Sequence, residues 1–418
     1  MFSDLEVVVT GLGLASPIGI GREAFWQSMG AGASGIGPIT LCDCSGLPVN
    51  LAGEVKGFEP KQWVRPKKSL KIMSRTMQLG VTAGTLAWED AGIGEGAVEP
   101  DRIGVVFGVD SICTPVELSP QGYAGTGGAL NLWVERAHEV GFPLQMLKIL
   151  PNLATCHLAI ALDARGPTNT HHHGDVSSLM ALYEAVSVIQ RGAADVVVAG
   201  GTSSLTDAFD WARSAVLDEL STADTAAMAP RPFAANRDGQ VRGEGAGAFV
   251  LESRAHAEKR GANILARIVG FGAAFAPSNG RDTDDAIVGA LSAAMARALT
   301  DADLQARDLG HVNAHGLGTV VGDRLEAAAI AKVLDNVPVT APKSYFGNLA
   351  AASGAIESAV TVLSLANGEL PPTLNAEQSD PDCPINVVKE PLRNLPPRGM
   401  VVGRTNIGQA AAMIFAGA

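Results

Sequence analysis

The sequence predicts an α/β fold in which buried β-sheets are packed between helices. Continuous apolar runs at residues 7–10, 102–108 and 196–199 are typical of strands that are buried on both faces. Segments with helical spacing of apolar residues separate these runs, and such alternation is the pattern of an α/β protein. The composition agrees, because 47% hydrophobic residues, 48 glycines and only 5% aromatic residues suit helices that pack closely on sheets.

The other elements continue this alternation along the chain. The further expected strands lie at residues 266–271, 309–314 and within 400–415. The expected helices lie at residues 25–29, 67–86, 158–162, 176–189, 286–299, 323–334 and 350–365. Residues 110–146 contain Gly and Pro, and they are expected to form loops with one amphipathic helix.

The first strand runs into Gly11-Leu12-Gly13, and two glycines after a strand can belong to a dinucleotide-binding turn. Such a site also needs an acidic residue at the end of a second strand about twenty residues further on. The sequence has none there. A dinucleotide site is therefore disfavoured, and no cofactor is expected.

Composition and charge exclude several classes of protein. The net charge of −12 disfavours a nucleic-acid partner, whose phosphates would be repelled. No run of 18 apolar residues indicates a membrane span. The five cysteines are scattered, apart from Cys42 and Cys44, and match neither a zinc spacing nor a disulfide framework. A soluble, cytoplasmic protein is expected.

Residues 166–201 hold the segment around which a site is expected to form. A Gly-Pro break and a polar run lead to Asp175, which opens an apolar segment with helical spacing that Gly192 ends. A buried-type strand follows. A turn that delivers one residue to the N-terminus of a buried helix is how many folds present a nucleophile, and here that residue is Asp175.

Asp175 also has a purely structural interpretation, which the residues alone favour, because Asp is a preferred helix N-cap. The three preceding histidines, His171, His172 and His173, suggest a metal site. Adjacent residues of a strand point to alternate faces, however, so the three cannot all bind one ion. No metal site is expected.

Several long blocks, in order and correctly spaced, resemble the β-ketoacyl-(acyl carrier protein) synthase family. They are VVVTGLGLASPIG, ADVVVAGG, RPFAANRDGQVRGEGAGAFVLE, VNAHGLGT and KSYFGNLAAASGAIES. The resemblance implies a thiolase-like fold, a duplicated five-layer αβαβα arrangement that is normally dimeric. It places the two ketosynthase-like halves at residues 1–253 and 254–418, each with a mixed five-stranded sheet.

The resemblance also shows where this sequence departs from the family's chemistry. The family uses a Cys thiolate to accept the acyl group, and Asp175 occupies that position. His315 matches the first of two catalytic histidines, whereas Asn348 stands at the second, in a motif that begins at Lys343. The family's Gly-Phe-Gly-Gly loop, which completes the oxyanion hole, reads Thr-Asn-Ile-Gly-Gln at residues 405–409.

Further residues correspond to the family's contacts with an acyl carrier protein. Thr319 keeps one of two threonines that hold the carrier's pantetheine, while Leu317 replaces the other. Lys67, Lys68 and Lys71, with Arg75, form a basic cluster expected at the start of a helix. The cluster is either a solvated helix face or a docking surface for the acidic carrier.

Two function classes follow from this pattern. The first is a partner subunit resembling a chain-length factor, which pairs with itself or with a Cys-bearing ketosynthase and shapes the acyl tunnel. The second is a thioester-processing enzyme that uses the altered site for decarboxylation, hydrolysis or Cys-free acyl transfer. The resemblance favours the first, with the dimer interface within residues 175–204 and the tunnel along residues 111–133.

Overall fold

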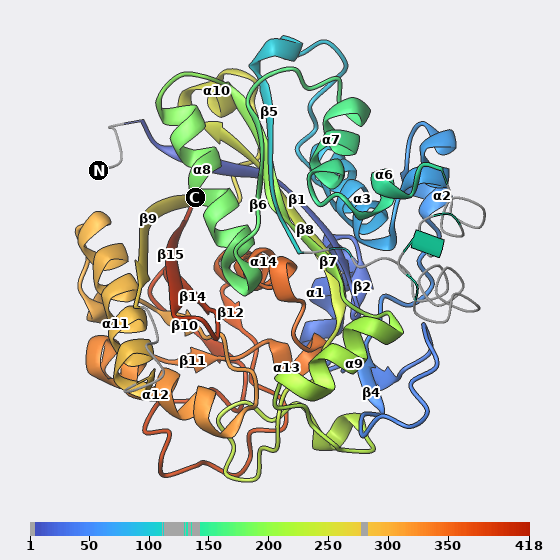
Figure 1. Ribbon diagram of the computed structural model, residues 1–418. Coiled ribbons are helices and arrows are strands. Elements are labelled where there is room, and N and C mark those ends of the chain that lie inside the picture. Colours follow the sequence, from blue (N-terminus) through green and yellow to red (C-terminus); the bar gives the residue numbers. More distant parts are fainter. Residues whose placement is uncertain are drawn as a thin grey trace.

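The computed structural model describes residues 5–110, 143–276 and 283–418, and between the first two ranges Ile112, Ala129, Asn131, Leu132 and Glu135 (Figure 1). Eleven of the described strands form one mixed sheet, whose order contains two units of five strands. The first unit is β6-β5-β7-β8-β1 and the second is β11-β10-β14-β15-β9. In both, two parallel pairings are followed by two antiparallel ones. The second unit thus repeats the topology of the first.

The strand bounds place the first unit before residue 254 and the second after it. The first unit consists of β1 (Val7–Ser16), β5 (Ile103–Val109), β6 (Thr168–His171), β7 (Val196–Ser204) and β8 (Glu244–Ser253). The second consists of β9 (Ala266–Phe275), β10 (His311–Asn313), β11 (Val339–Thr340), β14 (Arg398–Arg404) and β15 (Gln409–Gly417). The short strands are β2 (Gly19–Ile20), β3 (Ile36–Pro38), β4 (Leu51–Gly53), β12 (Glu369–Leu370) and β13 (Leu392–Arg393). The expected pair of five-stranded sheets is confirmed, with one addition. The two units are joined edge to edge, because the start of β1 pairs antiparallel with the start of β9.

Helices fill three layers around the two units, as the thiolase-like fold requires (Figure 1). Outside the first unit lie α3 (Arg75–Asp90) and α7 (Asn152–Ala161), and outside the second lie α11 (Thr283–Asp301) and α12 (Val320–Leu334). Between the units lie α8 (Ser177–Gln190) and α14 (Ser353–Asn367). The other helices of the described residues are α1 (Arg22–Gly30), α2 (Pro60–Trp63), α6 (Gln145–Ile149), α9 (Ala208–Leu217), α10 (Arg254–Lys259) and α13 (Lys343–Phe346).

The alternation of side chains along the strands explains this layering. In β7, Val196 and Val198 pack against the outer helices, whereas Val197 and Ala199 pack in the middle layer. Successive strand residues point to opposite faces, so an apolar residue at every position buries both faces of the sheet. Among the described helices, none combines the length and apolarity that a membrane span requires.

Two glycines allow the middle layer to approach the sheet closely. A Cβ at Gly108 in β5 would lie 2.5 Å from the backbone of Ser177, the first residue of α8. A Cβ at Gly201 in β7 would lie 2.5 Å from the carbonyl oxygen of Ala351, just before α14. Both distances are well inside van der Waals contact, so these strand positions fix where the two central helices begin.

A dimer interface is expected within residues 175–204, and the apolar strand in that range suggested it. For that strand, β7, the prediction is wrong. β7 pairs with β5 on one side and with β8 on the other, and all but its last residue are buried within this chain. Its apolar run is therefore explained by burial in the monomer, and it offers no surface to a second chain.

The prediction that a helix covers residues 67–86 is also wrong at its start. Lys67–Ile72 form a separate 3₁₀ turn, η1, and Met73 is extended. The helix α3 begins only at Arg75, where the hydroxyl oxygen of Ser74 accepts a hydrogen bond from the Met77 N–H. Ser at this position is a strong N-cap, and that local signal sets the helix start.

The close approach at Gly108 predicts that Gly108→Ala destabilises the protein by about 1–3 kcal/mol, the usual cost of overpacking a core. Denaturant unfolding measures this, with Gly289→Ala as the matched control. Gly289 lies in α11, where an added Cβ would meet nothing within 4 Å. Ala stabilises a helix relative to Gly by up to ~1 kcal/mol. A Gly108 variant as stable as the wild type would contradict the packing of α8.

Candidate active site

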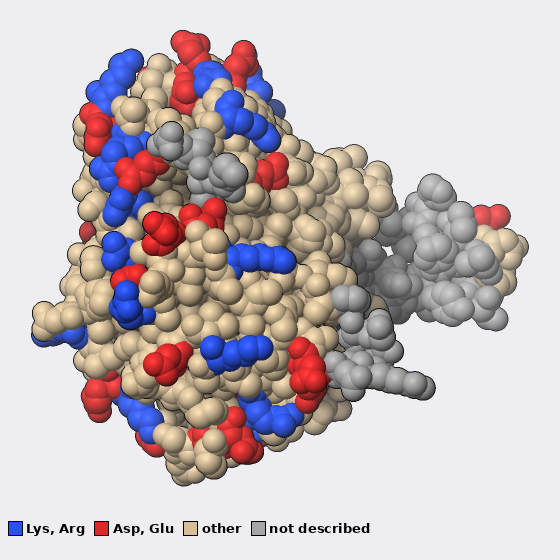
Figure 2. Space-filling view, turned by 90° about the vertical axis from the view of Figure 1, so that its left-hand side faces the viewer, with Lys and Arg blue, Asp and Glu red and all other residues tan. Residues whose placement is uncertain are grey.

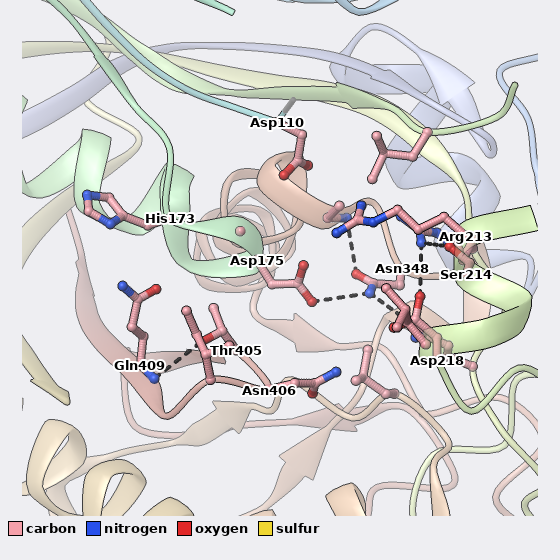
Figure 3. A pocket seen from close by; sticks show the side chains of 18 of the residues that line it. Asp110, His173, Asp175, Arg213, Ser214, Asp218, Asn348, Thr405, Asn406 and Gln409 are labelled. Atoms are coloured by element: carbon pink, nitrogen blue, oxygen red, sulfur yellow. Dashed lines mark hydrogen bonds and ion pairs between the residues drawn. The ribbon is translucent and has the colours of Figure 1, made fainter. Parts of the chain in front are cut away.

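Residues from both five-strand units line a cavity of about 400 Å³ (Figure 3). Its walls come from the end of β5, the turn before α8, the helix α9, the segment before β8, and the loops that follow β10, α13 and β14. Ionisable and amide side chains dominate the lining, and they include Asp110, Asp175, Arg213, Asp218, Gln240, Arg242, Asn348, Asn406 and Gln409. Aliphatic side chains, Leu205, Leu217, Leu317 and Ile407, contribute the apolar part of the lining.

Asp175 lies in a short 3₁₀ turn, η3 (Gly174–Val176), which Gly174 enters with φ +55°. The expectation that Asp175 caps the following helix is wrong. The helix α8 begins at Ser177, and no side-chain hydrogen bond caps either η3 or α8. The carboxylate instead turns into the cavity, where its Oδ2 lies 3.3 Å from His315 Nε2 and accepts a hydrogen bond of 3.2 Å from Asn348 Nδ2.

A buried row of charged groups stands behind His315. The Lys343 ammonium lies between the Glu357 carboxylate, with which it forms an ion pair, and His315 Nδ1, from which it is 3.1 Å. None of these three side chains is more than 1% exposed. Because an ammonium can only donate, Nδ1 accepts, and the neutral ring carries its proton on Nε2. That proton faces Asp175.

The environment separates the protonation states of these groups. Burial and the charge of Lys343 lower the pKa of His315 to about 3, although Asp175 opposes the shift. Burial acts to raise the pKa of Asp175, but His315, Lys343 and Asn348 together hold it below its usual value. Burial raises the pKa of Glu357 to about 7 despite its ion pair with Lys343. Near neutral pH the site therefore contains an ionised Asp175 next to a neutral His315.

Asn348 is held by hydrogen bonds on every side. Its Nδ2 donates to Asp175 Oδ2 and, at 2.8 Å, to Gln240 Oε1. Its Oδ1 accepts from the Ala350 N–H and from the Ser353 hydroxyl. The amide has two donors and two acceptor positions, so all four are used and none is left for a substrate.

Two buried carboxylates fix the loop that carries His315. Glu326 accepts hydrogen bonds from the N–H groups of His315 and Gly316, and Asp323 accepts from those of Leu317 and Gly318. Both acids come from α12, on the outer layer. Leu317 consequently faces the cavity, whereas Thr319 lies at the start of α12 and is not among the lining residues.

The site contains residues that the sequence pattern did not indicate. Asp110, which follows β5, points into the cavity, and its Oδ2 accepts a hydrogen bond of 2.7 Å from the Ala351 N–H (Figure 3). Burial raises its pKa, and the negative charge of Asp175 acts in the same direction. Arg242 donates to Ser214 and pairs with Asp218 at 3.0 Å. No local pattern marks these residues, because only the fold brings them to Asp175.

Other predicted residues lie away from this cavity. Lys67, Lys68 and Lys71 are exposed on η1, while the guanidinium of Arg75 pairs with the buried Glu244 at 2.6 Å and leaves the cluster. Nearly all of residues 111–133, the expected tunnel, lie outside the described residues.

The histidine run is held by other contacts. His171 pairs with Glu184, and His172 Nδ1 lies 2.8 Å from the Val109 carbonyl oxygen. The described ranges contain no group of three His, Cys, Asp or Glu residues arranged to hold a metal ion.

The buried histidines predict a pH dependence of stability. The pKa values of His315 and His311 are lowered by burial to about 3 and about 4, from an ordinary value of 6.5. At these two positions the unfolded chain therefore binds more protons than the folded one between those values and pH 6.5, so their contribution to stability falls as the pH is lowered through this range. Glu357 and Asp323, whose pKa values are raised to about 7 and about 6, contribute in the opposite direction, so the contribution of the histidines is measured by comparing variants from pH 7.5 to pH 5. The slope of the unfolding free energy against pH reports the difference in bound protons between the unfolded and folded chains. That difference should decrease by up to about one proton in His315→Asn or His311→Asn and by up to about two in the double variant. Slopes unchanged by either substitution would contradict the buried neutral rings.

Comparison with known proteins agrees with this architecture over nearly the whole chain. Residues 4–257 match the family described as "Beta-ketoacyl synthase, N-terminal domain" and residues 265–377 that described as "Beta-ketoacyl synthase, C-terminal domain". The chain is 33% identical over 411 residues to 3-oxoacyl-[acyl-carrier-protein] synthase 2 of Staphylococcus aureus, covering 94% of each chain.

Two solved structures are also similar. The ishigamide ketosynthase/chain length factor superposes with a TM-score of 0.88 at 27% identity, covering 100% of both chains. A β-ketoacyl synthase from Burkholderia phymatum superposes with a TM-score of 0.87 at 28% identity, covering 99% of this chain and 100% of the other. These relatives support a ketosynthase-like role in chain elongation. The chain belongs to the β-ketoacyl synthase family.

Proposed function

We propose that this chain is a non-catalytic partner of a Cys-bearing ketosynthase, a subunit of the chain-length-factor type in a fatty-acid or polyketide elongation system. The observation that carries the proposal is the place of Asp175. Its carboxylate lies 3.3 Å from His315 Nε2, in the turn where the family's chemistry requires a thiolate. The similarity to a structure described as a ketosynthase/chain length factor supports the same assignment.

The protonation states oppose condensation. A carboxylate is a weak acyl acceptor, and an amide at Asn348 cannot exchange a proton as an imidazole does. Removal of one general acid–base group typically costs ~10²–10⁴ in rate. Loss of the nucleophile removes the covalent route altogether, whatever else the site retains.

The negative charge in the cavity also opposes condensation. Asp175 is ionised, and the buried Asp110 carboxyl group lies close enough that each acid affects the other's charge. A condensing site must stabilise negative charge on a carbonyl oxygen, and one lost oxyanion donor alone costs ~10²–10³ in rate. A fixed anion beside that oxygen acts in the unfavourable direction, because charges interact strongly in a poorly solvated cavity.

Within the part of the chain that the structure describes, one edge of the sheet is open to a partner. The outer edge of β11 is covered, because Val339 bonds to the segment at residues 386–388. Its topological counterpart β6 pairs with β5 alone among the described strands. The Thr170 N–H bonds to the side chain of Asn169 instead of to a strand. An open strand edge is a template for pairing with another chain, so we place the partner interface at β6.

Docking of the acyl carrier protein is the second element of the proposal. Lys67, Lys68 and Lys71 lie exposed within five residues on η1, in a chain of net charge −12. On the side opposite to α2 and α6, acidic and basic side chains are interspersed (Figure 2). A cluster of one sign attracts an acidic partner locally even when the whole protein is negative. We assign the carrier to this cluster.

The proposal predicts that the purified protein forms no acyl-enzyme and no β-ketoacyl product with acyl- and malonyl-carrier proteins. Asp175→Cys alone should not restore condensation, because Asn348 would still occupy the position of the second histidine. Intact mass spectrometry and product analysis measure both. An acyl adduct on the unmodified protein would instead favour the alternative, a thioester-processing enzyme with an altered site.

The proposal also predicts a dimer, self-paired when the chain is expressed alone and heterodimeric when a Cys-bearing ketosynthase is co-expressed. Thr170→Pro should weaken both assemblies, because Pro removes the N–H that β6 presents at its open edge. Thr170→Val, which keeps the N–H, is the matched control and should assemble as the wild type does. Size-exclusion chromatography with light scattering measures the assemblies.

Two outcomes would count against this arrangement. Failure of the two chains to co-purify, with products of the ketosynthase unchanged by this chain, would reject the partner function. Dimers that survive Thr170→Pro would reject only the location of the interface.

A further inference from the structure

Cys42 and Cys44 bring their sulfur atoms together on the surface of the first half. The two Sγ atoms lie 3.1 Å apart within hydrogen-bonding distance. Both side chains are half-buried, and both are free thiols. A disulfide bond of about 2.05 Å would need the sulfurs to approach by only about 1 Å.

The loop around the pair is held in place. Glu54 accepts hydrogen bonds from the N–H groups of Thr40 and Leu41, at 2.8 and 2.9 Å. The Leu47 N–H donates to the Cys44 carbonyl oxygen. Both thiols pack against a cluster built on Trp211 of α9, which is 1% exposed. The contact between the sulfurs is thus imposed by the fold on both sides of the pair.

The environment of Cys42 disfavours its ionised form. Burial, followed by the neighbouring Cys44 and the acids Asp207 and Glu54, raises the pKa of Cys42 to about 12. Cys42 therefore keeps its proton more readily than an ordinary thiol does. The thiolate is the attacking form in thiol–disulfide exchange.

A second cavity provides access to the pair through Cys42. It has a volume of about 500 Å³, and its lining includes Leu41, Cys42 and Asp43 together with Ser204, Thr206 and Asp207. A small disulfide can reach the Cys42 side of the pair from this cavity. The cavity is distinct from the one around Asp175, since the two share no lining residue.

We propose that Cys42 and Cys44 are a reversible redox site that closes to a disulfide by exchange with a small disulfide of the glutathione class. The thiolate of one cysteine attacks one sulfur of the oxidant and releases one thiolate, which takes up a proton. The other cysteine then loses its proton and attacks the protein sulfur of the mixed disulfide, which releases the second thiol. Two protein thiols are oxidised and one small disulfide is reduced to two thiols, so atoms and electrons balance.

The site is placed where its state can affect the cavity around Asp175. The loop of the two cysteines packs on Trp211, and the same helix, α9, contributes Arg213, Ser214 and Leu217 to that cavity. Closing the disulfide fixes one side of the packing around Trp211. The proposal itself does not depend on the partner function, because it concerns only the chemistry of the pair.

The test equilibrates the full chain with reduced and oxidised glutathione at stepped ratios, quenches with acid, alkylates the free thiols and analyses the peptides by mass spectrometry. The peptide with both cysteines should lose both labels together and weigh about 2 mass units less than its reduced form. Excess reduced glutathione should reverse this. Cys42→Ser and Cys44→Ser should each stop at a glutathione adduct on the remaining cysteine. Cys156→Ser is the control that should leave the transition unchanged.

Two results would overturn the proposal. One is labelling of both cysteines at every ratio, including oxidised glutathione alone. The other is a wild type that carries only single glutathione adducts and no internal disulfide.

Discussion

The structure of the site depends on the ion pair between Lys343 and Glu357, which lies between the two sheets with almost no exposure to solvent. A buried charge without a partner costs several kcal/mol, so each of these residues requires the other. The ammonium then fixes the neighbouring imidazole, because it can only donate to Nδ1 of His315. The tautomer, the direction of the remaining N–H and the position of Asp175 all follow from that contact.

The fold brings these groups together through close backbone approach rather than through long side chains. Gly108 and Gly201 let the starts of α8 and α14 sit directly on the first unit of the sheet. Asp175 enters from the first of these helix starts and Asn348 from the segment just before the second. The internal duplication thus places equivalent helix starts face to face, and the cavity lies between them. Residues far apart in the sequence become neighbours because both helix starts pack on the first unit.

The sequence carries most of this information, but not all of it. Apolar strands and helical spacing predict the α/β layers, and the ordered blocks predict that Asp175, His315 and Asn348 belong to one site. The N-cap interpretation of Asp175 failed because a local preference worth ~1 kcal/mol competes with two tertiary contacts. The interface expected at β7 failed because an apolar strand looks the same whether its own chain or a second chain buries it. Asp110 was missed because a single Asp after a strand has no pattern of its own.

The contacts of Asp175 explain how a carboxylate is tolerated at this position. Removing an anion from water is costly unless polar groups surround it, and here His315 Nε2 lies 3.3 Å from the same oxygen that accepts a hydrogen bond from the Asn348 amide. The amide has no donor left, and the imidazole has only that one. The groups that would otherwise act on a bound thioester are therefore directed at the protein's own carboxylate. A substrate carbonyl would have to displace this carboxylate to reach them, which supports the proposal that the chain is a non-catalytic partner.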